Sequence, residues 1–239
     1  MIKNLFSKLI IFSFCLVLSN NSYAATNVKG AATQLIVTMT KVQLCESGST
    51  ITNCLNPIDI TVDEGATADI AAVTAGTAAA TVADFSKAAL GKSYTHIQTT
   101  MSRAFTITGK AGTSGKCTTV AGTNGGLNLA GAAGALNGTP GSAILYVPFF
   151  ADATNYPMME GQNEDGSDIA PLGEVRNTDT HFRSRMALTS TYTPSAGSSP
   201  TVFVAFDTSI AVNEDNDADC TDAGLQAAPP TVTLTVQGQ

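Results

Sequence analysis

The sequence predicts an all-β protein folded as an antiparallel β-sandwich with long Gly- and Ala-rich loops. Segments that alternate between apolar and polar residues with a period of two recur along the chain, and they are rich in β-branched residues. Turn-rich connections separate these segments, which favours a sandwich. The predicted strands are Leu35–Leu44, Pro57–Val62, Tyr94–Thr108, Ala143–Phe150, Phe182–Leu188, Val202–Val212 and Thr231–Gln237.

Two of these segments predict an irregular strand. Tyr94–Thr108 is long enough for one long strand or a bent pair, and alternation places Ile97, Thr99, Met101, Phe105 and Ile107 on one face. Pro148 interrupts the apolar run Ala143–Phe150, which predicts an edge strand or a bulge there.

The later strands have clearer faces. In Phe182–Leu188 the alternation puts Phe182, Ser184, Met186 and Leu188 inward, with Arg183 and Arg185 outward. The terminal segment Thr231–Gln237 places Val232, Leu234 and Val236 on one face.

Two regions depart from this pattern. Residues 69–90 are Ala-rich and contain one candidate short helix, at 82–90. Residues 109–141 consist mostly of Gly, Ala, Thr and Asn and include two Asn-Gly pairs, which favour turns. We expect this second region to be a long surface excursion, held near its start by Cys117.

The N-terminus has the features of a signal peptide at residues 1–24. Lys3 and Lys8 precede a ten-residue run, Leu9–Leu18, that is nearly all apolar, and the triplet Ser22-Tyr23-Ala24 follows. We expect cleavage after Ala24, which leaves residues 25–239 as a single β domain. Cys15 lies inside the apolar run and is removed with it, so we expect no lipid anchor. The expected location is outside the cytoplasm: periplasm, cell surface or extracellular space.

Composition disfavours several classes of partner. Without Lys3 and Lys8, ten basic residues remain against 19 acidic ones, a net charge of about −9. This charge argues against nucleic acid and anionic membrane surfaces, because both attract clustered Lys and Arg. After residue 24 no apolar run approaches the 18 residues of a membrane-spanning helix.

Four cysteines remain after residue 24. An even number in an exported chain favours two disulfides. Cys45 and Cys54 flank a polar segment that predicts a turn, so we pair them, and Cys117 then pairs with Cys220. No C-x-x-C pair is present to suggest zinc.

Residues 35–103 resemble a bacterial class of secreted sandwich domains of immunoglobulin or transthyretin-like type. The resemblance rests on VTMTKVQL at 37–44, on DIAAV at 69–73 and on LGKSYTHIQ at 90–98. It implies a Greek-key sandwich in which Tyr94 is a corner residue whose hydroxyl bonds nearby backbone. Gly91 lies three residues before Tyr94, where the pattern has two. The resemblance carries no functional site.

Recognisable catalytic motifs are few. Gly91-Lys92-Ser93 matches the end of a phosphate-binding loop, but Ser86 stands where the first glycine belongs and a predicted strand follows. We expect a polar turn there. The two histidines, His96 and His181, lie near strand starts, and no G-x-S-x-G or H-E-x-x-H occurs. We therefore expect a protein that is not an enzyme, with no catalytic or cofactor-binding residue.

Two acidic clusters raise the question of structural calcium. Asp215, Asp217 and Asp219 alternate before Cys220, beside Glu214, and such oxygens suit Ca²⁺. The competing interpretation, which we favour, is a solvated acidic loop. The second cluster comprises Glu160, Glu164, Asp165 and Asp168.

These features predict a non-catalytic secreted or cell-surface protein, with a structural or adhesive subunit as the first hypothesis. The terminal strand Thr231–Gln237 motivates it, because a terminal strand can pair with another copy of the chain by strand exchange, or with other surface proteins. The alternative is a soluble periplasmic binding domain for a small ligand or partner protein, with Tyr146, Phe149, Phe150 and Tyr156 as candidate lining residues. A hydrolase with an unrecognised site is third.

Overall fold

The computed structural model describes residues 28–72, 82–112, 115–128, 131–197, 201–214, 220, 224–228 and 231–237. Strands make up 48% of the described residues and helix 2%, so the fold class is all-β. The predicted signal peptide at 1–24 and the candidate calcium ligands Asp215, Asp217 and Asp219 lie outside the described residues.

The long strand β2 (Ala32–Glu46) is the centre of the main sheet. Along one side it pairs first with β6 (Ala104–Ala111) and then with β5 (Tyr94–Ser102). Only Arg103 separates β5 from β6, so together they form one bent strand antiparallel to β2, and the predicted bent pair is confirmed. The other side of β2 pairs with β4 (Ala66–Asp69) and β3 (Ile58–Asp59).

Beyond this centre the sheet divides into two wings. One wing continues from β5 and the other from β6, and their ladders are antiparallel except for a parallel contact between β11 and β12. The β5 wing contains β13 (His181–Tyr192), β11 (Met159–Gln162), β12 (Glu174–Val175) and β10 (Phe150–Ala151). The β6 wing contains β9 (Ala143–Tyr146), β7 (Cys117–Thr118) and β8 (Ala135–Leu136).

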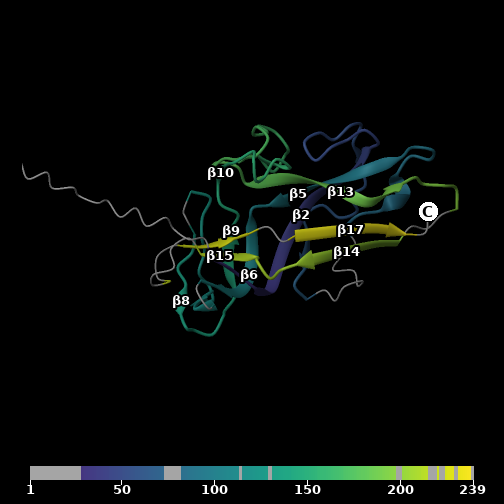
Figure 1. Cartoon of the computed structure of the whole chain (residues 1–239). Helices are drawn as coiled ribbons and strands as arrows, with labels where there is room; N and C mark the ends of the chain where they lie inside the picture. The colour runs from purple at the N-terminus through teal and green to yellow at the C-terminus, as the bar shows by residue number, and fades with distance from the viewer. Residues whose placement is uncertain are drawn as a thin grey trace, which may run out of the picture.

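The main sheet curls into part of a barrel, and two smaller sheets accompany it (Figure 1). The first joins β1 (Val28–Gly30), β15 (Val212–Glu214) and β16 (Leu225–Ala227). The second is a two-stranded ribbon of β14 (Thr201–Asp207) and β17 (Thr231–Gln237), which Figure 1 shows below β13 and β5. This curled arrangement differs from the two facing sheets of the expected sandwich.

Three predicted segments differ in detail. Residues 202–212 form two strands rather than one, because the carboxylate of Asp207 accepts a hydrogen bond from the Ser209 amide and starts a turn. The candidate helix at 82–90 is a single 3₁₀ turn, Phe85–Lys87. Pro148 lies between β9 and β10, because proline has no amide hydrogen to donate to a strand ladder.

The 109–141 region was expected to be a surface excursion, but part of it belongs to the interior. Thr119 is fully buried, and its hydroxyl donates to the Gly141 carbonyl at 2.6 Å and accepts from the Gly109 amide at 3.1 Å. Ala132 is also buried, in the larger core cluster. The small residues that suggest a flexible loop here instead allow close packing of backbone.

Tyr94 begins β5 and bonds nearby backbone through its hydroxyl. Its side chain is fully buried, and its hydroxyl accepts a hydrogen bond from the Ala89 amide at 3.1 Å. Its ring lies 6.3 Å from that of Tyr192, which in turn packs edge-on against Phe85 at 5.6 Å. These three aromatics anchor the smaller of two core clusters.

Both expected disulfides are present, Cys45–Cys54 and Cys117–Cys220. The first closes the short loop after β2. The second spans 103 residues and joins β7 to the segment before β16.

Arg103 holds the point where the two wings divide. Its side chain is 0% exposed. Its guanidinium donates to three carbonyls at 3.0 Å or less, those of Val147, Arg176 and Asp179. Its own amide donates to Thr180, and its carbonyl accepts from Val147. One residue thus links the β5–β6 bend to the segments before β10 and β13.

The charge of Arg103 is buried beside that of Asp179, which is also 0% exposed. Burial lowers the pKa of Arg103 to about 10, while the nearby Asp179 acts in the opposite direction. Arg103 therefore stays charged at neutral pH. Gly161 makes room for the carboxylate, because a Cβ at this position would lie 1.8 Å from Oδ2 of Asp179.

We predict that Arg103→Met lowers the free energy of unfolding by about 3–5 kcal/mol, because it leaves buried carbonyls without a donor and leaves the Asp179 carboxylate with only the Arg176 ion pair at 3.3 Å. Urea denaturation measures the effect. Lys116→Met, at an exposed lysine, is the control and should change stability by about 0.5 kcal/mol at most. An Arg103→Met protein as stable as the parent would contradict the role of this junction.

The two disulfides should contribute unequally. In the chain-entropy model a closed loop of about 100 residues stabilises by about 4.7 kcal/mol, and a loop of about ten residues by roughly 2–3 kcal/mol. We therefore expect Cys117→Ala/Cys220→Ala to lower the urea midpoint more than Cys45→Ala/Cys54→Ala. The reverse order would show that the short loop carries contacts beyond loop closure.

Candidate functional site

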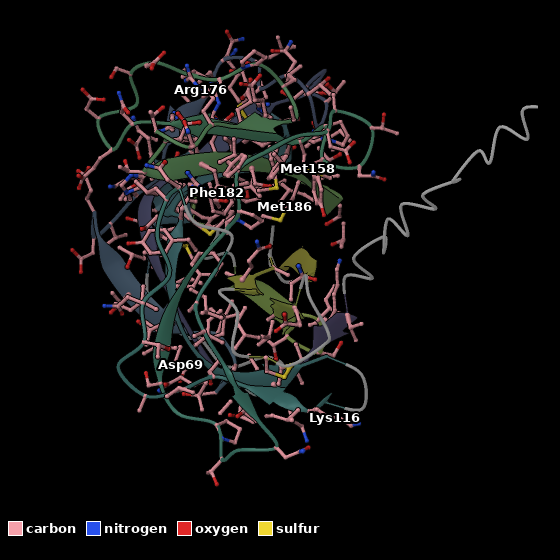
Figure 2. The ribbon with its side chains drawn as sticks, turned by 90° about the vertical axis from the view of Figure 1, so that its left-hand side faces the viewer. Asp69, Lys116, Met158, Arg176, Phe182 and Met186 are labelled. Carbon is pink, nitrogen blue, oxygen red and sulfur yellow. A yellow bond between two sulfur atoms is a disulfide. The ribbon has the colours of Figure 1, made fainter. Side chains whose placement is uncertain are left out.

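One side of the main sheet carries a group of partly buried methionines. Met39 and Met101 are register partners on β2 and β5, and Met186 lies on β13. With Met158, which precedes β11, these side chains are partly buried and border the core clusters. Figure 2 shows Met158 and Met186 on the side of the sheet toward the ribbon.

The ribbon itself is held by its own ladder. Seven residue pairs join β14 and β17, from Thr201↔Gln237 to Asp207↔Thr231. β17 runs close to β13 but forms no ladder with it in the part of the chain that the structure describes. Within the described residues the β17 strand therefore has one ladder, with β14.

The opposite face of the sheet carries a buried polar row across four strands. Gln43 on β2 accepts from Gln98 on β5 at 2.8 Å, and Gln98 accepts from Arg185 on β13 at 2.7 Å. Arg185 then donates to Glu160 on β11 at 2.5 Å. The row follows the strand register, because Gln43 is paired with Gln98 and Gln98 with Arg185.

Arg185 corrects a prediction, since alternation placed it outward in solvent. It does lie on the face opposite Phe182, but it is only 4% exposed. Glu160 accepts from both Arg183 and Arg185 through one carboxylate oxygen, and Arg185 also lies 3.5 Å from the Thr52 carbonyl of the Cys45–Cys54 loop. Alternation predicts which face a residue occupies, but it does not predict that a distant loop covers Arg185 on that face.

The second acidic cluster does not form one site. Glu160 is buried in the row just described, and Asp168 pairs with Arg176 at 3.0 Å. Asp165 accepts from both the amide and the hydroxyl of Ser167, which lowers its pKa. Among the described residues no three His, Cys, Asp or Glu side chains are grouped as metal ligands.

The candidate phosphate loop is a turn, as expected. Gly91 has a positive φ of 73°, Lys92 pairs with Glu46 at 3.3 Å, and Ser93 bonds Thr193 at 2.8 Å. Strand β5 follows instead of a helix.

Each histidine bonds the threonine that precedes it in the chain. The Nδ1–Oγ1 distances are 3.0 Å for His96 and Thr95 and 2.9 Å for His181 and Thr180. Burial lowers the pKa of His96, and it also lowers that of His181, where Glu164 opposes the shift. In the described residues neither ring has a hydrogen bond to a carboxylate or a serine.

The four candidate aromatics do not line one pocket. Phe150 and Tyr156 pack together with ring centroids 4.7 Å apart and join the larger core cluster. Phe149 is exposed, and Tyr146 is half-buried beside Gly125. The core-packing interpretation therefore fits Phe150 and Tyr156.

The comparisons with known proteins give no relative: no family model, curated protein or solved structure matches the chain. The resemblance of residues 35–103 to secreted sandwich domains stays a prediction. No helix in the described ranges is long and apolar enough to cross a membrane.

The two histidines predict how stability depends on pH. A histidine whose folded-state pKa is lowered binds fewer protons in the folded than in the unfolded state near pH 6, so the free energy of unfolding should fall as pH decreases from about 7 to about 5. His96→Asn/His181→Asn should flatten this part of the curve, measured by urea denaturation at each pH. An unchanged slope in the double variant would assign the effect to other groups.

Proposed function

We propose that this protein is an exported, non-catalytic structural subunit of the cell surface whose copies join by exchanging the C-terminal strand β17. The observation that carries the proposal is the ribbon: in the described residues β17 has a ladder with β14 alone, in a sheet separate from the main one. As part of this proposal, the ribbon supplies the second layer of a sandwich over the concave face.

The physical argument concerns what holds β17 in place. A two-stranded sheet is marginal by itself in water, so the ribbon depends on packing against the methionine-bearing face. A β17 strand from another copy can form the same seven backbone pairs and the same packing. Exchange between identical chains therefore loses no native interaction, and the flexible thioethers tolerate small differences in fit.

Export is supported by two independent features. Residues 1–24 have the charge and apolar pattern of a signal peptide. The two disulfides suit an oxidising compartment.

A second candidate function is a soluble periplasmic binding domain. It is favoured by a polar groove of about 530 Å³ beside β2. The aromatic residues considered for such a role lie elsewhere.

A disulfide lock across the ribbon tests strand exchange. Ala205 and Thr233 are register partners on β14 and β17, so Ala205→Cys/Thr233→Cys can join these strands within one chain. Oxidised as a monomer, the variant should fail to form oligomers or filaments in electron microscopy and light scattering. Oxidised after assembly, it should give covalent multimers on a non-reducing gel, because the pair then bridges two chains.

Thr38→Cys/Thr67→Cys is the matched control. It joins another antiparallel pair, β2 and β4, without involving the ribbon, and it should assemble like the parent. A parent chain that stays monomeric at high concentration would refute the structural role. Assembly by the locked monomer would refute exchange of β17.

A further inference from the structure

A polar groove crosses the face of the main sheet that is opposite the ribbon. Its volume is about 530 Å³. Thr40, Lys41 and Thr100 line it from β2 and β5. Gln162, the last residue of β11, lies with them on the floor. One wall is the 59–64 segment, which leads from the end of β3 toward β4, and the other is the turn at 164–166 after β11.

Two largely buried residues present polar groups to the groove. Thr100 is 4% exposed and Gln162 is 5% exposed, and both line the groove. In the described part of the chain, neither the hydroxyl of Thr100 nor the amide of Gln162 forms a hydrogen bond. The fully buried unpaired polar atoms of the described residues include neither group, so both are open to the groove and can bond a ligand with polar groups.

The charges of the groove favour a cation. Four carboxylates line it against two ammonium groups. Both lysines are engaged with the groove's own wall, since Lys41 lies 4.0 Å from Asp59 and Lys87 donates to the Thr61 carbonyl.

Two carboxylates remain available to a ligand. Glu64 belongs to one wall and Glu164 to the other, and neither has a hydrogen bond in the described residues. Asp165, by contrast, is already held by Ser167.

We infer that this groove binds an organic cation with primary ammonium groups on an aliphatic chain. Glu64 and Glu164 pair with the ammonium groups, and Thr100 and Gln162 accept hydrogen bonds from them on the floor. The volume far exceeds that of a bare ion, and the described residues hold no metal-ligand group. None of the described residues that line the groove is an aromatic that could stack against a sugar ring.

Titration of the purified chain with 1,4-diaminobutane at low ionic strength, followed by calorimetry, tests this inference. We expect saturable binding with Kd on the order of 1 mM or tighter. Glu64→Gln/Glu164→Gln should weaken it about tenfold or more, because both countercharges are lost. Gln162→Leu should weaken it too, since the floor loses its amide. Glu174→Gln removes the same charge outside the groove and should leave binding unchanged.

Three results would overturn the inference: no saturable binding by the parent chain, equal binding of the uncharged 1,4-butanediol, or tighter binding of Ca²⁺ at the same residues. Thermal melts of each variant confirm that it is folded before its titration is interpreted. Because the groove and the ribbon lie on opposite faces of the sheet, a chain locked at Ala205→Cys/Thr233→Cys should still bind the diamine. The two proposals can therefore fail separately.

Discussion

The buried guanidinium of Arg103 is the interaction on which the rest of the architecture depends. The strand beside β2 bends between β5 and β6, and the regular ladder of the sheet is interrupted there. Backbone groups near such a bend need hydrogen-bond partners from outside the ladder. Arg103 lies at this bend, and its rigid guanidinium donates to three carbonyls of the segments before β10 and β13, which ties those segments to the bend. The bend then sends β5 toward β13 and β6 toward β9, which produces the curled shape.

The two faces of the curled sheet have different chemistry. One face is apolar, with partly buried methionines at the border of the core clusters. The other face is polar even where it is buried, as the row from Gln43 to Glu160 shows. A fully paired polar row fixes strand register, because a slip of one residue would place arginine in the apolar interior. We suggest that this rigid side lets the ribbon side change partners without loss of the fold.

The proposed assembly and the proposed amine site follow from this division. Strand exchange uses backbone pairing and apolar packing, which any copy of the chain can supply. The groove uses the polar groups of Thr100 and Gln162, which have no hydrogen bond within the described residues, together with carboxylates on two walls. The predicted export would expose both faces to the surroundings of the cell.

The sequence by itself determined the all-β class, most strand positions and the two disulfide pairs, because alternation and cysteine count are local or countable properties. It also indicated the bent pair at 94–108. Only the tertiary structure decided that Arg185 is buried, that 109–141 enters the core, and that Thr100 and Gln162 share a groove. Alternation places Arg103 on the same face as Met101 and Phe105, which is apolar. An arginine on that face is stable only where carbonyls from distant parts of the chain converge on it. Convergence depends on strand register and loop path, which the local pattern does not encode.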